Sequence, residues 1–352
     1  MSDSLPTTQA HPRAALFDPD EKAVPRLPVC DHYSGVESRM RKSLELQAEW
    51  GPVFDVTLDN EDGAPVGGEL AQAQLIAELL DDPLNRHGRV GVRLLPVAHA
   101  RFADVLHAVL RARRRPAYLM LPKPRGVAEV QRAAAAIDAA GGASIPLHAL
   151  IETHGGLREV QAIAAHPRIE SLSFGLMDFV SAHRGAIPSS AMGVQGQFEH
   201  PLVVRAKLEI SAACHAEGKV ASHCVVTEFK RTAALQEAAG AAARRFGYTR
   251  MWSIHPAQIR PIVEAYAPTA SEVAEAVEIL VAAQAAQWAP IRHRHAGQDR
   301  LHDRASYRYH WQLVERAHRT GMAGPQVLPP AQREAWFGAA QPATGAPAAS
   351  AQ

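Results

Sequence analysis

Short apolar runs alternate with longer amphipathic segments along most of this chain. Eight of the runs have the length and residue types of buried strands. They lie at residues 27–32, 53–58, 90–95, 117–121, 147–152, 171–175, 220–225 and 251–254. The segments between them place apolar residues at i, i+3 and i+4, which indicates helices that cover a sheet. Eight strands, with a helix before each next strand, predict an α/β protein: a (β/α)8 TIM barrel with an appended C-terminal helical segment.

The same pattern divides the chain into parts. We expect a flexible N-terminus at 1–25, a catalytic barrel at 26–268, and a C-terminal helical arm at 269–320 that could be exchanged between subunits. The arm begins with a strongly amphipathic segment at 270–288, which favours self-association. Residues 338–352 are rich in Ala, Pro and Gly, and a segment of this composition is expected to be disordered.

Composition narrows the classes of function. The chain has 37 Lys and Arg against 36 Asp and Glu, so it lacks the broad positive field of a non-specific nucleic-acid binder. No apolar run reaches the length of about 18 residues that a membrane span needs, and the N-terminus has no apolar signal region. Three cysteines are too few for a disulfide framework or a structural zinc site. We therefore expect a cytoplasmic protein that binds neither nucleic acid nor a membrane.

Ionisable side chains stand at or just after the predicted strands. In barrels of this type the active site is built from the loops that follow the strands. The residues at these positions are Asp31, His32, Asp59, Glu61, Asp62, Arg93, Lys123, Glu152, Asp178, His223 and His255. Packing alone would favour Val, Ile and Leu there, and a buried charge is costly unless it is paired. We interpret the set as a functional pocket.

Two of these carboxylates suggest a metal site. Glu152 and Asp178 end neighbouring strands, and two carboxylates with open positions suit Mg²⁺ better than zinc. Alternatively, Glu152 pairs with Arg93 or Lys123 in an ion network, and Asp178 caps the following loop. The residues alone leave both interpretations open.

The segment 292–310 is rich in His, Arg and Tyr. It could hold an anionic partner such as a phosphate group, or form an exposed face of an oligomer arm. Its sequence HRHAGQDRLH (293–302) has no spacing diagnostic of zinc. No GxGxxG follows the first predicted strand and no GxxxxGK[ST] occurs, so the chain shows no nucleotide-phosphate loop.

Three motifs together resemble one known family. They are IETHGGLREVQAIA (151–164), SLSFGLMDF (171–179) and SIHPAQ (253–258), supported by VGVRLLP and LPKPRG. In this combination, spread over roughly residues 38–280, the sequence is similar to the citrate lyase β-subunit-like family, also called the HpcH/HpaI aldolase/citrate lyase family.

The resemblance implies a magnesium-dependent carbon–carbon lyase. Such an enzyme cleaves or forms a C–C bond of a 3-hydroxyacyl-CoA, such as malyl-, citramalyl- or citryl-CoA, through a metal-stabilised enolate. By matching motif, Glu152 and Asp178 would bind Mg²⁺, with Mn²⁺ as the other candidate. Arg93 would hold the carboxylate or enolate oxygen of the substrate and act in catalysis. The family would also imply a homo-oligomer, with a homotrimer favoured.

The remaining roles also follow from the resemblance. Within LDNED, which corresponds to the family's acidic motif after the second strand, Glu61 is a catalytic candidate and Asp62 a substrate-binding one. Lys123 matches the LPK motif and, like His255 of SIHPAQ, is expected to contact substrate.

The sequence departs from the family in two places. LPVCDHYSG (27–35) replaces an arginine–serine strand, which alters the surface expected to contact CoA. Asp303 is the candidate for a C-terminal acid/base that reaches a neighbouring subunit. If neither Asp299 nor Asp303 serves, His32 or His255 would have to transfer the proton. Two alternatives therefore stand beside the lyase: a CoA-independent pyruvate-type class II aldolase, or a non-catalytic barrel that binds an acyl metabolite as an accessory subunit.

Overall fold

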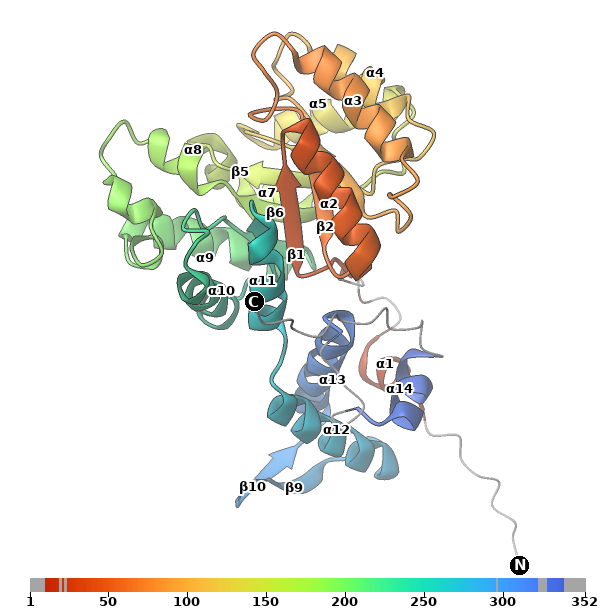
Figure 1. Ribbon diagram of the computed structural model, residues 1–352. Helices are drawn as coiled ribbons and strands as arrows, with labels where there is room; N and C mark the ends of the chain where they lie inside the picture. The colour runs from red at the N-terminus through yellow and green to blue at the C-terminus, as the bar shows by residue number, and fades with distance from the viewer. Residues whose placement is uncertain (1–9, 19–20, 22–23, 296, 322–327, 339–352) are drawn as a thin grey trace, which may run out of the picture. The chain divides into compact units, whose positions relative to one another are not determined.

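Eight parallel strands form a closed barrel in this computed structural model, which describes residues 10–18, 21, 24–295, 297–321 and 328–338 (Figure 1). The strands are β1 (Cys30–Ser34), β2 (Asp55–Asp59), β3 (Val90–Arg93), β4 (Leu119–Leu121), β5 (Leu147–Ile151), β6 (Ile169–Phe174), β7 (Val220–His223) and β8 (Arg250–Ser253). Each strand pairs with the next, and β1 also pairs with β8. The predicted (β/α)8 barrel is confirmed.

Helices follow the strands and cover the outside of the barrel. They are α2 (Glu37–Trp50), α3 (Glu69–Asp81), α4 (Phe102–Leu110), α5 (Val127–Ala139), α6 (His154–Arg158), α7 (Val160–Ala165), α8 (Leu176–Ser181), α9 (Pro201–Ala216), α10 (Thr232–Phe246) and α11 (Ile259–Tyr266). Three 3-10 turns, η1 (Ser189–Met192), η2 (Gly196–Phe198) and η3 (Pro256–Gln258), complete the unit. One apolar core joins the helices to the outward side chains of the strands.

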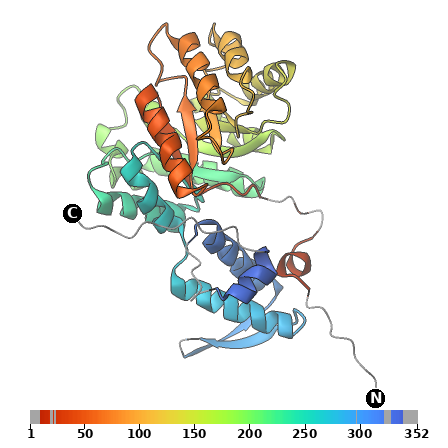
Figure 2. The ribbon, with the colours of Figure 1, turned by 45° about the vertical axis from the view of Figure 1, so that its right-hand side comes forward.

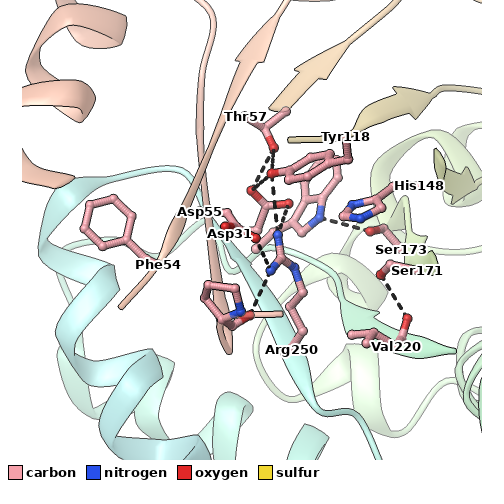
Figure 3. Close-up of polar contacts among 12 residues, drawn as sticks. Asp31, Phe54, Asp55, Thr57, Tyr118, His148, Ser171, Ser173, Val220 and Arg250 are labelled. Atoms are coloured by element: carbon pink, nitrogen blue, oxygen red, sulfur yellow. Dashed lines mark hydrogen bonds and ion pairs between the residues drawn. The ribbon is translucent and has the colours of Figure 1, made fainter. Parts of the chain in front are cut away.

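The inside of the barrel holds a layer of buried charged and hydroxyl side chains, which we name the lower layer: Asp31, Asp55, Thr57, Tyr118 and Arg250 (Figure 3). Arg250 donates to Asp55 Oδ2 at 2.5 Å, and its Nη2 lies 3.0 Å from Asp31 Oδ2. The hydroxyls of Thr57 and Tyr118 both donate to Asp31 Oδ1, at 2.7 and 3.0 Å. Asp55 and Arg250 are the first residues of their strands, so this layer lies toward the N-terminal end of the barrel.

The first strand therefore differs from its prediction. It begins at Cys30 instead of residue 27, so Asp31 lies near its start and the expectation of Asp31 at the strand exit is wrong. Gly91 on β3 explains how the lower layer fits. A Cβ at Gly91 would lie 2.1 Å from the ring of Tyr118, so only glycine leaves room for that ring.

A second compact unit, here the arm unit, comprises the described residues up to 21 together with those from Ala267 onward. Its elements are α1 (Pro12–Leu16), α12 (Ala270–Ala285), β9 (Ile291–His295), β10 (Gln298–His302), α13 (Arg304–Arg319) and α14 (Pro330–Phe337). Thr269 and Glu272 form a capping box that starts α12. The unit has a core of its own, centred on Trp311 and Trp336.

Two parts of the arm unit differ from the sequence-based picture. Within the stretch expected to be flexible, α1 buries Leu16 in the arm core. Between α12 and α13, where only helix was expected, β9 and β10 form an antiparallel hairpin. Residues 339–352 of the tail lie outside the described residues. In the described part of the chain, no helix is long and apolar enough to cross a membrane.

Candidate active site

Five ionisable side chains converge at the C-terminal end of the barrel. Asp59 ends β2, Arg93 ends β3, Lys123 follows β4, Glu152 follows β5, and Asp178 lies in the first turn of α8 after β6. Because all strands are parallel, these positions share one end of the barrel. The loop after β2 adds Glu61 and Asp62. We call these seven residues the upper site.

Arg93 is held by carboxylates on three sides. Its Nε and Nη2 donate to the two oxygens of Asp59 at 2.6 and 3.0 Å, a bidentate pair. Its Nη1 lies 2.9 Å from Glu61 Oε2, and its Nη2 lies 3.2 Å from Asp62 Oδ2. Burial opposes the charge of Arg93, but the bonds to Asp59 outweigh it and raise the pKa of the guanidinium. The charge of Arg93 is therefore permanent and its position fixed.

Lys123 joins the carboxylates from the other side. Its Nζ lies 2.6 Å from Glu61 Oε1, 3.5 Å from Asp62 and 3.6 Å from Asp178. Burial opposes the charge, yet the bond to Glu61 raises the pKa of Lys123 above its usual value. Its backbone is left-handed, with φ at 51°, a conformation uncommon for a residue other than glycine. In that conformation the backbone N–H of Lys123 donates to Glu152 Oε1 at 3.0 Å.

Glu152 is almost fully buried, with 3% of its surface exposed. Burial first, and then the charges of Asp178 and Glu61, raise its pKa well above the usual value. Gly175, just before α8, provides the space that the carboxylate needs. A Cβ at Gly175 would lie 2.2 Å from Glu152 Oε2. Sequence reasoning missed Gly175, although it stands in the motif SLSFGLMDF.

The upper site carries more negative than positive charge. In the described part of the chain, four of its five carboxylates (Asp59, Glu61, Asp62 and Asp178) form ion pairs with two cationic side chains, Arg93 and Lys123, while Glu152 accepts from the backbone N–H of Lys123. Repulsion among the carboxylates contributes to the raised pKa of Glu152. An oxygen-only set with surplus negative charge fits a hard divalent cation such as Mg²⁺.

Glu152 and Asp178 are the residues that could hold such a cation. Among the described residues, no third His, Cys, Asp or Glu joins them to form a compact set of three ligand atoms. Waters and a substrate would fill the remaining positions, as is usual for Mg²⁺. The contacts differ from the alternative drawn from the sequence: Glu152 accepts from the backbone N–H of Lys123, and it is Asp178 whose Oδ1 lies 3.6 Å from Lys123 Nζ.

The proposed proton-transfer residues lie in other settings. His255 caps the start of η3, where its ring nitrogen accepts from the Ala257 N–H at 3.2 Å. Its ring stacks on Phe229. His32 is buried against Phe54 and bonds to Ser253 Oγ at 3.0 Å. Burial lowers the pKa of His32 to about 4, so its ring is neutral at neutral pH.

The C-terminal candidates belong to the arm unit. Asp303 caps α13, where its Oδ1 accepts from the N–H groups of Ala305 and Ser306 at 3.1 and 3.3 Å. Asp299 pairs with Arg292 at 2.5 Å. Both residues thus lie in the arm unit, whereas the upper site belongs to the barrel unit. His223, on β7, is fully buried and stacks on Phe198, as a packing residue would.

Two aromatic residues beside the upper site were missed by the sequence analysis. Tyr33 stacks on Trp252 with ring centroids 5.5 Å apart, and its hydroxyl accepts from Arg93 Nη2. The Arg93 guanidinium lies 4.8 Å from the centroid of the same ring. Alternation along β1 could have found Tyr33, since it shares the inward face with Asp31 two residues earlier.

A cavity of about 230 Å³ lies beside the residues that follow Glu152 and Asp178. It is bordered by α6, α8 and α9, and its lining includes His154, Arg158, Phe179, His183 and Arg205. Its two arginines and its apolar wall could accept an anionic group that has an apolar neighbour.

Comparison with known proteins identifies the family of the barrel. Residues 53–256 match the model of the HpcH/HpaI aldolase/citrate lyase family. The chain is 30% identical over 207 residues to an L-malyl-CoA/β-methylmalyl-CoA lyase from Cereibacter sphaeroides, and 29% identical over 204 residues to one from Rhodobacter capsulatus. Each match covers 53% of this chain and 63% of the relative, so the chain spans less than two thirds of these relatives.

Solved structures share more of the chain. A citrate lyase from Burkholderia xenovorans LB400 is 54% identical, with a TM-score of 0.79 over 90% of this chain and 98% of that chain. The CitE protein from Mycobacterium tuberculosis, in complex with magnesium, acetoacetate and coenzyme A, is 23% identical. Its TM-score is 0.65 over 83% of this chain and 98% of that chain, a likeness of fold.

Proposed function

Because the chain belongs to the HpcH/HpaI aldolase/citrate lyase family, we propose that it is a carbon–carbon lyase that depends on Mg²⁺ and acts on a 3-hydroxyacyl-CoA such as malyl-, citramalyl- or citryl-CoA. One observation carries the proposal: the surplus of carboxylates, with Glu152 buried among them, around Arg93 and Lys123 at the C-terminal end of the barrel. The names of the malyl-CoA lyase relatives support the substrate class.

In the proposed reaction, the substrate hydroxyl loses its proton as the bond between its carbon and the carbon beside the thioester breaks. The electron pair of that bond forms an enolate of the thioester, which then takes up a proton on carbon. Mg²⁺, or Mn²⁺, would supply Lewis-acid stabilisation of the charge on oxygen when bound. Glu152 and Asp178 would hold the cation.

The side chains around the cation have separate proposed roles. Arg93, fixed by Asp59, would supply a permanent positive charge toward the substrate carboxylate or enolate oxygen. Lys123 and Asp62 would orient the substrate, and His255, which follows β8, would contact it as well. Glu61 bridges Arg93 and Lys123 and would act in catalysis through its carboxylate.

The proton donor is proposed to come from another copy of the chain. Asp303 would reach the barrel of a neighbouring subunit in a homo-oligomer, for which a trimer is favoured. Its carboxylate already caps α13, and this bond would have to be shared or broken. A variant Asp303→Asn retains an N-capping group and removes the acid. Loss of turnover in this variant without loss of stability would support the role.

The test is an assay on purified protein with malyl-, citramalyl- and citryl-CoA and with free 4-hydroxy-2-oxo acids. Each substrate is incubated with Mg²⁺ or with EDTA, and the products are identified by NMR. Magnesium-dependent cleavage of a thioester is the expected result. Cleavage of the free acids alone would overturn the CoA dependence and identify a pyruvate-type aldolase.

The CoA-independent aldolase is the second candidate. One observation favours it: Asp31, on the strand where the family's arginine–serine motif is replaced, is fully engaged in the lower layer. A non-catalytic accessory barrel would bind Mg²⁺ and an acyl-CoA without turning it over. Calorimetry with CoA, run beside the assay, separates these outcomes.

A further inference from the structure

The β9–β10 hairpin of the arm unit places several histidines on one face. His293 and His295 lie two residues apart on β9, so both side chains point to the same side of the hairpin. His302 pairs with Ile291 across the hairpin and therefore shares this side. In Figures 1 and 2 the hairpin lies along α12, whose contacts with β9 bring Glu278 to the same face.

Glu278 and the two histidines of β9 form a compact set. Glu278 Oε2 lies 3.5 Å from His293 Nε2 and 3.7 Å from His295 Nδ1. All three ligand atoms lie within 4.8 Å of one another, and among the described residues this is the one such group of three or more His, Cys, Asp and Glu side chains. The carboxylate therefore faces both rings at once.

These distances are too long for hydrogen bonds. A hydrogen bond between nitrogen and oxygen has a length of about 2.7–3.2 Å. Ligands about 2.0–2.1 Å from a tetrahedral zinc ion are separated from each other by about 3.3 Å, from the geometry of the tetrahedron. The distances from Glu278 to the two histidines are thus closer to those between ligands around an ion than to those of a hydrogen-bonded pair.

Two histidines on this face, His293 and His302, have ring nitrogens without a hydrogen bond within the described part of the structure. His293 Nε2 is buried without a hydrogen-bond acceptor or donor among the described residues. His302, whose ring contacts that of His293, has 6% of its surface exposed. Neither of its ring nitrogens has a hydrogen-bond partner among the described residues. A buried polar atom without a partner costs free energy, which an ion or a bound water would remove. Glu278 is half exposed and leaves the group open to solvent.

We propose that Glu278, His293 and His295 bind a borderline transition-metal ion such as Zn²⁺, with water at the fourth position. Two imidazoles and one carboxylate are a known donor set for zinc, and imidazole nitrogen distinguishes this site from the oxygen-only upper site. The ion ties the hairpin to α12. Linear spacing hid the site, because its carboxylate lies on the preceding helix and its histidines alternate along a strand.

The test uses the full chain, stripped of metal and then held in excess Mg²⁺ to occupy hard-cation sites. Zn²⁺ is titrated by calorimetry, and one equivalent per chain is expected to bind. His293→Ala and His295→Ala should each weaken this binding by at least about a hundredfold, more than the loss typical of a residue that only supports a ligand. Equal Zn²⁺ affinity in the wild type and both variants would overturn the proposal.

Two controls have matched chemistry. Arg294→Ala changes the opposite, exposed face of β9 and should leave Zn²⁺ binding unchanged. His107→Ala removes an exposed histidine of α4 in the barrel unit and should also have no effect. Far-UV circular dichroism checks that each variant is folded. Should an alanine variant not fold, Glu278→Gln, at a half-exposed position, tests the same site and should weaken Zn²⁺ binding as well.

A spectroscopic readout identifies the ligands directly. Cu²⁺ added in place of Zn²⁺ should give an electron paramagnetic resonance spectrum with nitrogen hyperfine structure in the wild type. This structure should be lost or reduced in His293→Ala and retained in Arg294→Ala. A spectrum with oxygen ligation alone in the wild type would contradict the site.

Discussion

The barrel buries charge in two places, and the two differ in their balance. In the lower layer two carboxylates, Asp31 and Asp55, face two guanidiniums. Arg250 pairs with both, and Arg89 donates to Asp55 at 2.7 and 2.8 Å. In the upper site four carboxylates share Arg93 and Lys123, and a fifth, Glu152, accepts from the backbone N–H of Lys123. Because its charges are balanced, the lower layer can be buried without a further ion. The upper site has an excess of negative charge, which a bound cation would offset.

This difference separates a framework from a functional site. The charges of the lower layer sit at the N-terminal end of the barrel, where residues serve stability, and those of the upper site at the end where chemistry is found. Burial raises the pKa of Asp55, and both arginines oppose that rise. At Glu152 burial is reinforced by neighbouring carboxylates. The predictions below separate the two regions, beginning with the largest expected effect.

Glu152→Gln should abolish Mg²⁺ binding and turnover without lowering the free energy of unfolding. The substitution keeps the shape of the side chain and removes a charge that burial, Asp178 and Glu61 disfavour. Calorimetry with Mg²⁺, the thioester assay and urea unfolding measure the three quantities. Wild-type turnover in this variant, or in EDTA, would contradict the role of the upper site.

Arg250→Met should destabilise the protein by about 3–5 kcal/mol, because it leaves Asp31 and Asp55 buried without their shared partner. The loss is measured by urea unfolding. The matched control is Arg41→Met, which removes an exposed ion pair with Glu37 on α2 and should cost no more than about 0.5 kcal/mol. Similar losses in both variants would show that the ion pairs of the lower layer do not stabilise the fold.

A pair of glycines tests each region by the same change. Gly91→Ala would press a methyl group into the ring of Tyr118 in the lower layer, and Gly175→Ala would press one into the carboxylate of Glu152. Each should cost about 1–3 kcal/mol of stability, as overpacking does. Only Gly175→Ala should also weaken Mg²⁺ binding. Equal effects of the two variants on Mg²⁺ affinity, measured by calorimetry, would contradict the assignment of metal binding to the upper site alone.

His32 gives the smallest effect, through pH. Its pKa is about 4 in the folded protein because of burial, against about 6.5 in an unfolded chain. Between these values the unfolded chain binds more protons, so stability is present above pH 6.5 and is lost as the pH falls toward 4. From pH 7 to pH 5 this group should cost about 1–2 kcal/mol. Urea unfolding of His32→Gln should show a smaller acid loss than the wild type, and an equal loss would contradict the assignment.

The sequence predicted the barrel because its eight strand-like apolar runs are separated by amphipathic helical segments, a pattern that favours a closed parallel sheet covered by helices. It also brought Glu61, Arg93, Lys123, Glu152 and Asp178 to one end, since each follows or ends its own strand. The sequence did not predict which of these side chains would bond to one another. Which carboxylate pairs with Arg93 depends on side-chain positions that no spacing encodes.

Errors arose where register decides the outcome. A shift of three residues in the start of β1 moved Asp31 from the exit of the strand to the lower layer. The same shift hid Tyr33, whose ring contacts Arg93. In the arm unit, alternation over five residues of β9 was too short to separate from the surrounding helical pattern. Short strands and their exact ends are set by tertiary partners more than by local sequence.

The pairing of β1 with β8 also sets an order of assembly. Asp31 and Asp55 enter the growing chain early, while Arg250, their common partner, comes from the last strand of the barrel. Until that strand emerges during synthesis, Asp55 has only Arg89 as an ion-pair partner and Asp31 lacks the pair with Arg250, so burial of Asp31 is costly. A ribosome-bound chain that ends before β8 would hold two open sheet edges and an acid without its ion pair. The final strand closes the barrel and supplies that pair in one step.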